Sequence, residues 1–192
     1  MKKILFMLAI AMMALNCAAQ GKKAAKKSVP ASGETITVTA GATSSTVTDL
    51  ALAYINKHSE LEGAPELAAY AQDPSKDSYA VVTDTCVFLN AGEMNLSVAI
   101  WPRDNGKTLV GVIYCGKQIS FYNYDKAAGT MTRDNGVGSP VTSIRGGDDY
   151  LSFDVDGIHC TVMRLTGYGS YFNFNGSKFV PVKYDLGQAP TW

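Results

Sequence analysis

Histidine is scarce in this sequence, and the common catalytic motifs are absent. Only His58 and His159 occur among the 192 residues, which is little material for a zinc site or a serine protease triad. His159 precedes Cys160 in an expected strand, where neighbouring side chains point to opposite faces, so it is the wrong partner for that thiol. The chain also lacks a Gly-x-Ser-x-Gly elbow, a phosphate-binding loop and a dinucleotide-binding fingerprint. No cofactor is therefore expected.

The sequence also has no excess of charge of either sign. It contains 17 Lys and Arg against 17 Asp and Glu, for a formal net charge of zero. This balance gives no basic footprint for nucleic acid or for anionic lipid. Beyond the N-terminal segment no stretch is long and apolar enough to span a membrane. We therefore expect no nucleic-acid partner and no transmembrane helix.

Cysteine and acidic residues occur, but without the spacing of a metal site. There is no Cys-x-x-Cys, and Cys86, Cys115 and Cys160 are expected either as buried thiols or with one disulfide among them. Asp154-x-Asp156-Gly157 lacks the further ligands of an EF-hand loop and predicts a hairpin turn instead. Asp148, Asp149 and Asp134 are the only other candidates for a calcium site, and we predict no metal.

The N-terminus has the pattern of a secretory signal. Two lysines precede the apolar run Ile4–Leu15, which is shorter than a spanning helix requires. One interpretation is cleavage between Ala19 and Gln20, and the alternative is lipidation at Cys17. Both predict a signal peptide over residues 1–19 and an exported protein, either periplasmic, secreted or lipid-anchored to the envelope.

After the signal, residues 20–33 are rich in Lys, Ala and Ser and predict a flexible linker. Residues 34–192 are expected to form a single β-rich domain. Its first part, residues 34–78, contains a candidate strand at Glu34–Thr39, a helix at Thr46–Leu61 and a second short helix from Pro65 to Gln72.

From residue 79 onward the pattern changes to short β runs separated by Gly, Asn and Asp, which is typical of an antiparallel meander. A faint duplication indicates two similar units of four or five strands, at 79–136 and 137–192. The fold class is thus α+β, predominantly antiparallel β, with a closed barrel as the alternative. The expected strands are Tyr79–Leu89, Asn95–Trp101, Lys107–Cys115, Gln118–Tyr124 and Thr130–Arg133, then Val141–Ile144, Tyr150–Val155, Ile158–Leu165, Ser170–Phe174 and Lys178–Lys183.

The tetrapeptide Arg-Asp-Asn-Gly occurs twice, at 103–106 and at 133–136. In the first copy, Asn105-Gly106 lies between two β runs and is a strong hairpin signal. The second copy falls between the two units. Because the copies occupy non-equivalent places, we predict turn chemistry in both rather than a shared chemical role.

Aromatic residues concentrate in the β region, and four of them are candidate binding residues. Trp101, Tyr122, Tyr124 and Tyr171 are expected to stack on a sugar ring or to anchor a protein, if they lie on an exposed sheet face. The alternative is that they are buried, since strands favour aromatic residues in the core.

The segments "SYAVVTDTCVFL", "LSVAIWPRDNGKTLVGVIYCG" and "ISFYNYD" lie mostly within Ser78–Asp125. In these segments the chain resembles small exported β-rich proteins of unknown function from Gram-negative bacteria. The resemblance implies export and a β-rich domain. Function is predicted as non-catalytic binding or envelope association, with a protein or a glycan as partner. The alternative is a small extracytoplasmic hydrolase that uses paired carboxylates, or a cysteine with His58.

Overall fold

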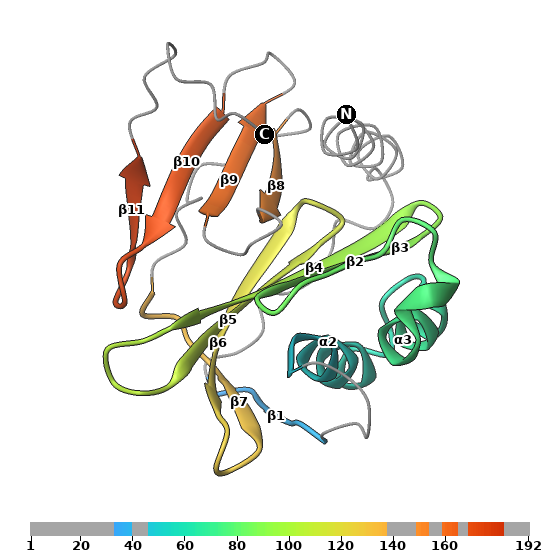
Figure 1. Ribbon diagram of the computed structural model, residues 1–192, viewed down its shortest axis with the longest axis horizontal. Helices are drawn as coiled ribbons and strands as arrows, with labels where there is room; N and C mark the ends of the chain where they lie inside the picture. Colours follow the sequence, from blue (N-terminus) through green and yellow to red (C-terminus); the bar gives the residue numbers. More distant parts are fainter. Residues whose placement is uncertain (1–32, 40–45, 138–148, 154–158, 165–168, 183–192) are drawn as a thin grey trace.

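Two helices cover one face of a seven-stranded antiparallel sheet, and a four-stranded sheet packs against the opposite face (Figure 1). The computed structural model describes residues 33–39, 46–137, 149–153, 159–164 and 169–182. None of the helices within these ranges is long and apolar enough to cross a bilayer.

The elements follow one another in chain order. The helices are α2 (Thr46–Lys57), α3 (Ala64–Gln72) and the short 3-10 helix η1 (Pro74–Lys76). The larger sheet contains β1 (Thr35–Thr37), β2 (Val81–Val82), β3 (Cys86–Ala91), β4 (Met94–Pro102), β5 (Thr108–Tyr114), β6 (Gln118–Asp125) and β7 (Thr130–Arg133). The smaller sheet contains β8 (Asp149–Phe153), β9 (His159–Arg164), β10 (Gly169–Phe174) and β11 (Phe179–Val182).

Both sheets are open meanders. The strand order is β1-β7-β6-β5-β4-β3-β2 in the larger sheet and β11-β10-β9-β8 in the smaller one. Strand β1 precedes the helices in the chain but joins the sheet beyond β7, antiparallel to it. Because β1 and β2 are edges, the described strands form no closed barrel, and that alternative is wrong for them.

Side chains alternate along the central strands, and both alternating sets are apolar. On the helical face, Val98 of β4 is opposite Val112 of β5, and both belong to the core shared with α2 and α3. On the other face, Trp101 is opposite Leu109, and both belong to the core shared with the smaller sheet. A sheet that is apolar on both faces requires a cover on each.

Glycine and proline mark the start of the second helix. Helix α2 ends at Lys57, four residues before the predicted Leu61. Helix α3 starts at Ala64, with Pro65 in its first turn and Gly63 before it at φ +73°. A left-handed residue of this kind suits glycine, and proline is tolerated in a first turn because the amide there has no helical partner.

The core between the sheets is aromatic. The Trp101 ring lies 5.2 Å from the rings of both Phe153 and Phe179, measured between centroids. It lies 6.2 Å from the Phe174 ring. These rings reach the sheet surface because Gly111 has no side chain, and a Cβ there would be 2.7 Å from Phe153 Cζ.

Among the described residues, two backbone hydrogen bonds join the sheets directly. The Leu151 N–H of β8 donates to the Gly116 carbonyl in the β5–β6 turn at 2.7 Å. The Asp104 N–H of the β4–β5 hairpin donates to the Gly176 carbonyl in the β10–β11 turn at 3.3 Å.

The predicted α+β class is confirmed at the level of two helices and a predominantly antiparallel sheet. The expected strand Tyr79–Leu89 is wrong in detail, because β2 and β3 form a hairpin. Thr83 makes the turn: its hydroxyl oxygen accepts from the Cys86 N–H at 2.9 Å. The predicted strand Val141–Ile144 lies outside the described residues.

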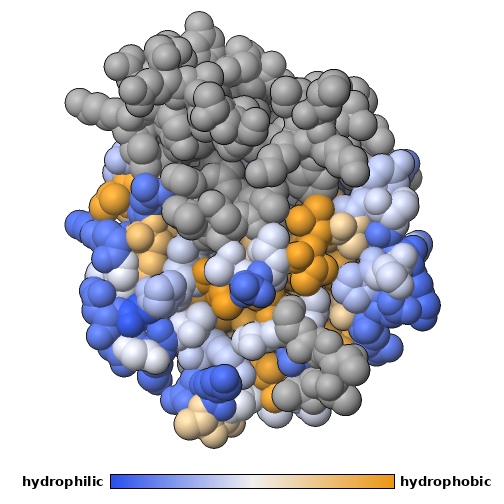
Figure 2. All heavy atoms as spheres, viewed as in Figure 1, coloured by the Kyte–Doolittle hydropathy of each residue, from blue (hydrophilic) through white to orange (hydrophobic). Residues whose placement is uncertain are grey.

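Hydrophilic residues dominate the described surface on the face seen in Figure 2, and hydrophobic residues appear there in separate patches. Among the described residues, Tyr79 and Val82 are the large hydrophobic side chains that are exposed. Both belong to the β2 end of the larger sheet.

Replacement of Gly111 tests the packing between the sheets. Gly111→Ala introduces a Cβ that would lie 2.7 Å from Phe153 Cζ and 2.8 Å from Trp101 Cζ3. We expect a loss of about 1–3 kcal/mol in the free energy of unfolding, because overpacking forces rings out of their rotamers. Urea denaturation measures the loss. The double variant with Phe153→Leu should recover part of it, and equal stability of Gly111→Ala and wild type would contradict the packing.

Candidate functional site

A cleft of about 320 Å³ lies between strand β1 and helix α2. Three of its lining residues, Ile36, Leu52 and Ala53, are apolar, and the others are polar or charged. The residues that line it are Thr35, Ile36, Thr37, Thr39, Leu52, Ala53, Asn56 and Lys57.

Among the described strands, only β7 pairs with β1, along one of its edges. The Arg133 N–H donates to the Glu34 carbonyl at 2.7 Å, and the Val38 N–H donates to the Gly129 carbonyl at 2.8 Å. Between these two bonds, Ile36 is in register with the centre of β7. Backbone groups alternate in an antiparallel ladder, so Glu34, Ile36 and Val38 direct theirs toward β7.

The alternation leaves Thr35 and Thr37 facing the other way. Their backbone N–H and C=O groups point to the outer edge of β1, where no described strand pairs. Both residues also line the cleft. The cleft therefore has one wall of outward-facing backbone donors and acceptors, and one wall formed by a helix.

Helix α2 lines the cleft with the side of the helix that does not pack on the sheet. Leu50, Ala51 and Ile55 are at most 2 % exposed and pack on the sheet. Leu52 is half-buried, and Asn56 is exposed beside it one turn further on. Helical periodicity places residues four apart on the same side, so Leu52 and Asn56 face the cleft together.

A polar network fixes β1 against α2 and β6. Glu34 Oε1 lies 3.2 Å from His58 Nε2, just beyond the end of α2. Its other oxygen accepts from the Tyr122 hydroxyl at 3.0 Å. Arg133 donates to that hydroxyl at 3.3 Å and places its guanidinium carbon 5.3 Å from the Tyr122 ring centroid. The Tyr54 ring lies 4.4 Å from the His58 ring.

Burial keeps the two tyrosines protonated. It raises the pKa of Tyr54 to about 12, and the nearby Glu34 carboxylate adds to the rise despite the opposing effect of Arg133. Burial also raises the pKa of Tyr122, with Tyr54 adding to it. Both hydroxyls are therefore hydrogen-bond donors near neutral pH, and neither is poised as a base.

The network is nearly closed to solvent. The side chains of Glu34 and His58 are 12 % and 13 % exposed, whereas that of Glu60, which lies 3.6 Å from His58 Nδ1, is 70 % exposed. Glu34 and Glu60 thus approach one imidazole from two sides. Among the described residues, no group of three metal-ligating side chains has the geometry to hold a metal ion.

The structure places the four predicted aromatic residues in different surroundings. Trp101 is 5 % exposed and Tyr122 is fully buried, so these two side chains offer no surface to a ligand. The reason is that both faces of the sheet are covered. Tyr124 is half-buried against the helical core, and the side chain of Tyr171 lies outside the described residues. The predicted processing residues Cys17, Ala19 and Gln20 also lie outside them.

The alternative site pairs a cysteine with His58, and the side chain of Cys160 lies outside the described residues. Cys86 is buried between the sheets, which is one of the two states expected from the sequence. The Cys115 thiol lies 3.4 Å from the Met94 sulfur, whereas His58 contacts Glu34 and Glu60.

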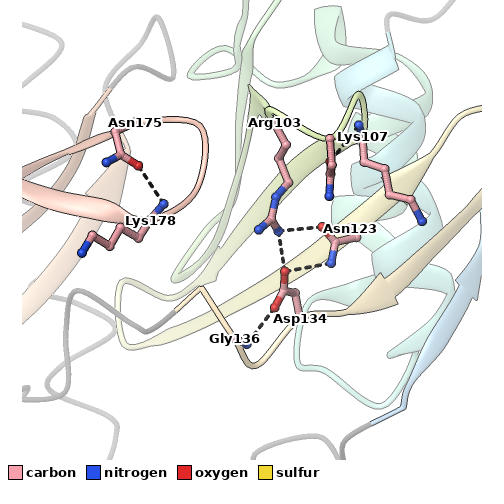
Figure 3. A network of polar contacts seen from close by, with 8 residues as sticks. Arg103, Lys107, Asn123, Asp134, Gly136, Asn175 and Lys178 are labelled. Carbon is pink, nitrogen blue, oxygen red and sulfur yellow. Dashed lines mark hydrogen bonds and ion pairs between the residues drawn. The ribbon is translucent and has the colours of Figure 1, made fainter.

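The two Arg-Asp-Asn-Gly copies meet in space, which the sequence did not predict. Arg103 of the first copy donates through Nη1 to Asp134 of the second copy at 2.5 Å and to Asn123 Oδ1 at 2.7 Å (Figure 3). Asn123 Nδ2 completes the triangle by donating to Asp134 Oδ2 at 2.8 Å. The predicted turn chemistry is present too, since Asp134 Oδ1 accepts from the Gly136 N–H at 2.7 Å. The copies are turns that also share one ion pair.

No protein-family model, no curated protein and no solved structure matches this chain.

The ion pair between the two copies should contribute measurably to stability. Its side chains are 14 % and 12 % exposed, so we expect Arg103→Met to lower the free energy of unfolding by roughly 1.5–3 kcal/mol. A double-mutant cycle with Asp134→Asn should show coupling between the two substitutions. Lys107→Met is the matched control, because its pair with Asp125 is exposed and should contribute little. Additive losses in the cycle would contradict a direct interaction.

Acidification should remove the contribution of Asp134. Burial alone would raise its pKa, but the Gly136 amide and the Arg103 guanidinium lower the pKa below that of an ordinary aspartate. A lowered pKa stabilises the fold above the unfolded pKa of about 4 and loses that effect as pH falls through the folded value. The stability difference between wild type and Asp134→Asn should therefore shrink in acid, as measured by urea denaturation across pH. A constant difference would contradict this assignment.

Proposed function

We propose that this protein is an exported, non-catalytic binding module whose ligand is an extended polypeptide segment. The single observation that carries the proposal is the cleft of about 320 Å³ between helix α2 and the edge of β1 that no described strand pairs. An added strand is the ligand whose backbone matches a sheet edge, and β-strand addition of this kind is a recurring mode of peptide recognition.

The lining of the cleft favours a polypeptide over a glycan. None of the described lining residues is aromatic, and aromatic faces are what a sugar ring stacks on. Thr35 and Thr37 offer backbone donors and acceptors at the spacing of a partner strand. Leu52 and Ala53 suit one apolar side chain of the ligand, and Lys57 suits a carboxylate near it.

Export remains part of the proposal and rests on the N-terminal sequence. The apolar run Ile4–Leu15 behind two lysines supports a signal peptide. A mature protein beginning at Gln20, or carrying lipid on Cys17, would decide between the two forms of processing. N-terminal sequencing and mass measurement of the chain from an envelope fraction test this, and retention of residues 1–19 on a cytoplasmic protein would contradict it.

We also infer that the two meanders are similar units, and that each uses the equivalent sheet face to pack on the layer that precedes it. Leu96 and Tyr122 point toward the helices that precede their sheet. Their aligned counterparts, Leu151 and Phe172, pack toward the sheet that precedes theirs. Both alignments thus agree on the face, which supports duplication. An experimental superposition of β4–β7 on β8–β11 that requires a one-residue slip would contradict it, because a slip reverses the face.

A hydrolase with paired carboxylates is the second candidate. Glu34 and Glu60, which flank His58, are the acids that would carry it. The low exposure of Glu34 favours the binding module, since a substrate must reach both acids.

Substitution of one amide tests strand addition directly. Linear peptides selected from a random library on the mature chain are the probes, and fluorescence polarisation measures their Kd. Thr37→Pro removes an outward-facing N–H without removing a bond to β7, so we expect Kd to rise about tenfold or more. Thr37→Ala keeps the amide and is the matched control.

A larger side chain in the cleft provides a second test of the same site. Leu52→Trp should also weaken peptide binding, because Leu52 lines the cleft. Peptides that bind Thr37→Pro and Leu52→Trp as tightly as wild type would contradict the proposed site. Failure to select any peptide would contradict the proposed ligand class.

A further inference from the structure

Three Asn-Gly dipeptides occur in this chain, and all three lie in tight turns with the asparagine exposed. They are Asn105-Gly106, Asn135-Gly136 and Asn175-Gly176. They differ in the hydrogen bonding of the glycine amide, and in the number of N–H groups that donate to the asparagine Oδ1, which is one at Asn105 and Asn135 and two at Asn175.

An Asn-Gly pair undergoes a known type of intramolecular reaction. The glycine nitrogen attacks the asparagine Cγ, a new N–Cγ bond forms, and the side-chain amide leaves as ammonia with the proton that the nitrogen gives up. Water then opens the resulting succinimide at either carbonyl and yields aspartate or isoaspartate. Water is consumed, ammonia is released, and no oxidant or enzyme is required. The rate depends on a free glycine N–H and on stabilisation of the oxygen that becomes anionic.

The first two sites hold the nucleophile in a hydrogen bond. The Gly106 N–H donates to the Arg103 carbonyl at 3.0 Å. The Gly136 N–H donates to Asp134 Oδ1 at 2.7 Å. An amide whose N–H is held by an acceptor gives up its proton less readily.

The third site has the opposite arrangement. Within the described part of the chain the Gly176 N–H has no hydrogen-bond acceptor. Asn175 Oδ1 accepts two backbone hydrogen bonds, from Ser177 at 3.1 Å and from Lys178 at 2.9 Å. The bond from Lys178 is drawn in Figure 3. Two N–H groups on one carbonyl oxygen polarise the carbon and stabilise the oxyanion that forms on attack.

We propose that Asn175 is a site of spontaneous deamidation, and that it reacts well before Asn105 and Asn135. The structure also gives the modification a consequence. The Asp104 carboxylate lies against Gly176, and the Asp104 N–H is bonded to the Gly176 carbonyl. A new carboxylate at position 175 repels Asp104, so deamidation weakens the backbone hydrogen bond between Asp104 and Gly176, which joins the two sheets.

Peptide mapping by mass spectrometry tests the order of reaction. The folded mature chain is incubated at mildly alkaline pH, and conversion to aspartate and isoaspartate is followed at the three sites. We expect Asn175 to react about tenfold faster than the other two, the ratio that corresponds to one favourable hydrogen bond in a transition state. In denaturant the three rates should converge, because the folded hydrogen bonds are lost and all three sites share the Asn-Gly dipeptide. Equal rates in the folded chain, or faster reaction at Asn105 or Asn135, would overturn the proposal.

Two variants test the consequence separately. Asn175→Asp reproduces one product, and Asn175→Ser keeps a hydrogen-bonding side chain without the charge or the reactive amide. Asn175→Asp should unfold at lower urea concentration than Asn175→Ser at neutral pH. The difference should diminish when Asp104→Asn is added to both. Equal stability of the two variants would overturn the proposed repulsion.

Discussion

The central sheet carries apolar side chains on both of its faces, and the arrangement of the other layers depends on this. Val98 and Val112 require a cover on one side, which α2 and α3 provide. Trp101 and Leu109 require a cover on the other, which the smaller sheet provides. Burial of apolar area at about 25 cal/mol per Å² makes either uncovered face too costly for a stable monomer. The three layers are thus a consequence of the strand pattern.

The same constraint explains where the molecule remains open. With both faces covered, the larger sheet meets its surroundings through its edges, β1 and β2. Short edge strands limit uncontrolled pairing between copies of a protein. Strand β1 is short, and Glu34 anchors its start to His58 and Tyr122. Anchoring holds the edge at a fixed distance from α2, so that a cleft remains between them.

Much of the fold was predictable from local sequence. Alternating β runs and the Asn105-Gly106 turn located β4 to β7 within about one residue, because strand period and turn chemistry are local properties. The burial of Trp101 was not predictable, since period-two alternation separates two faces without saying which of them is covered. Gly111 was the missed signal, as a glycine in a strand interior marks a close approach.

The candidate site was less predictable for the same physical reason. Glu34 and Tyr122 are 88 residues apart in the chain, and no local pattern reports such a contact. The contact between Arg103 and Asp134 does not follow from the repeat, because non-equivalent positions in a repeat can still lie close together in space. Each copy of the repeated turn carries an arginine and an aspartate. An ion pair between the two copies could therefore have been predicted from the sequence.

Amide hydrogen exchange along β1 in the free protein tests the central claim, that its outer edge is open. Exchange followed by NMR should alternate along the strand: slow at Ile36, whose backbone is directed toward β7, and fast at Thr35 and Thr37. Protection of all three amides would mean that the outer edge is already occupied, and it would contradict the proposed peptide site.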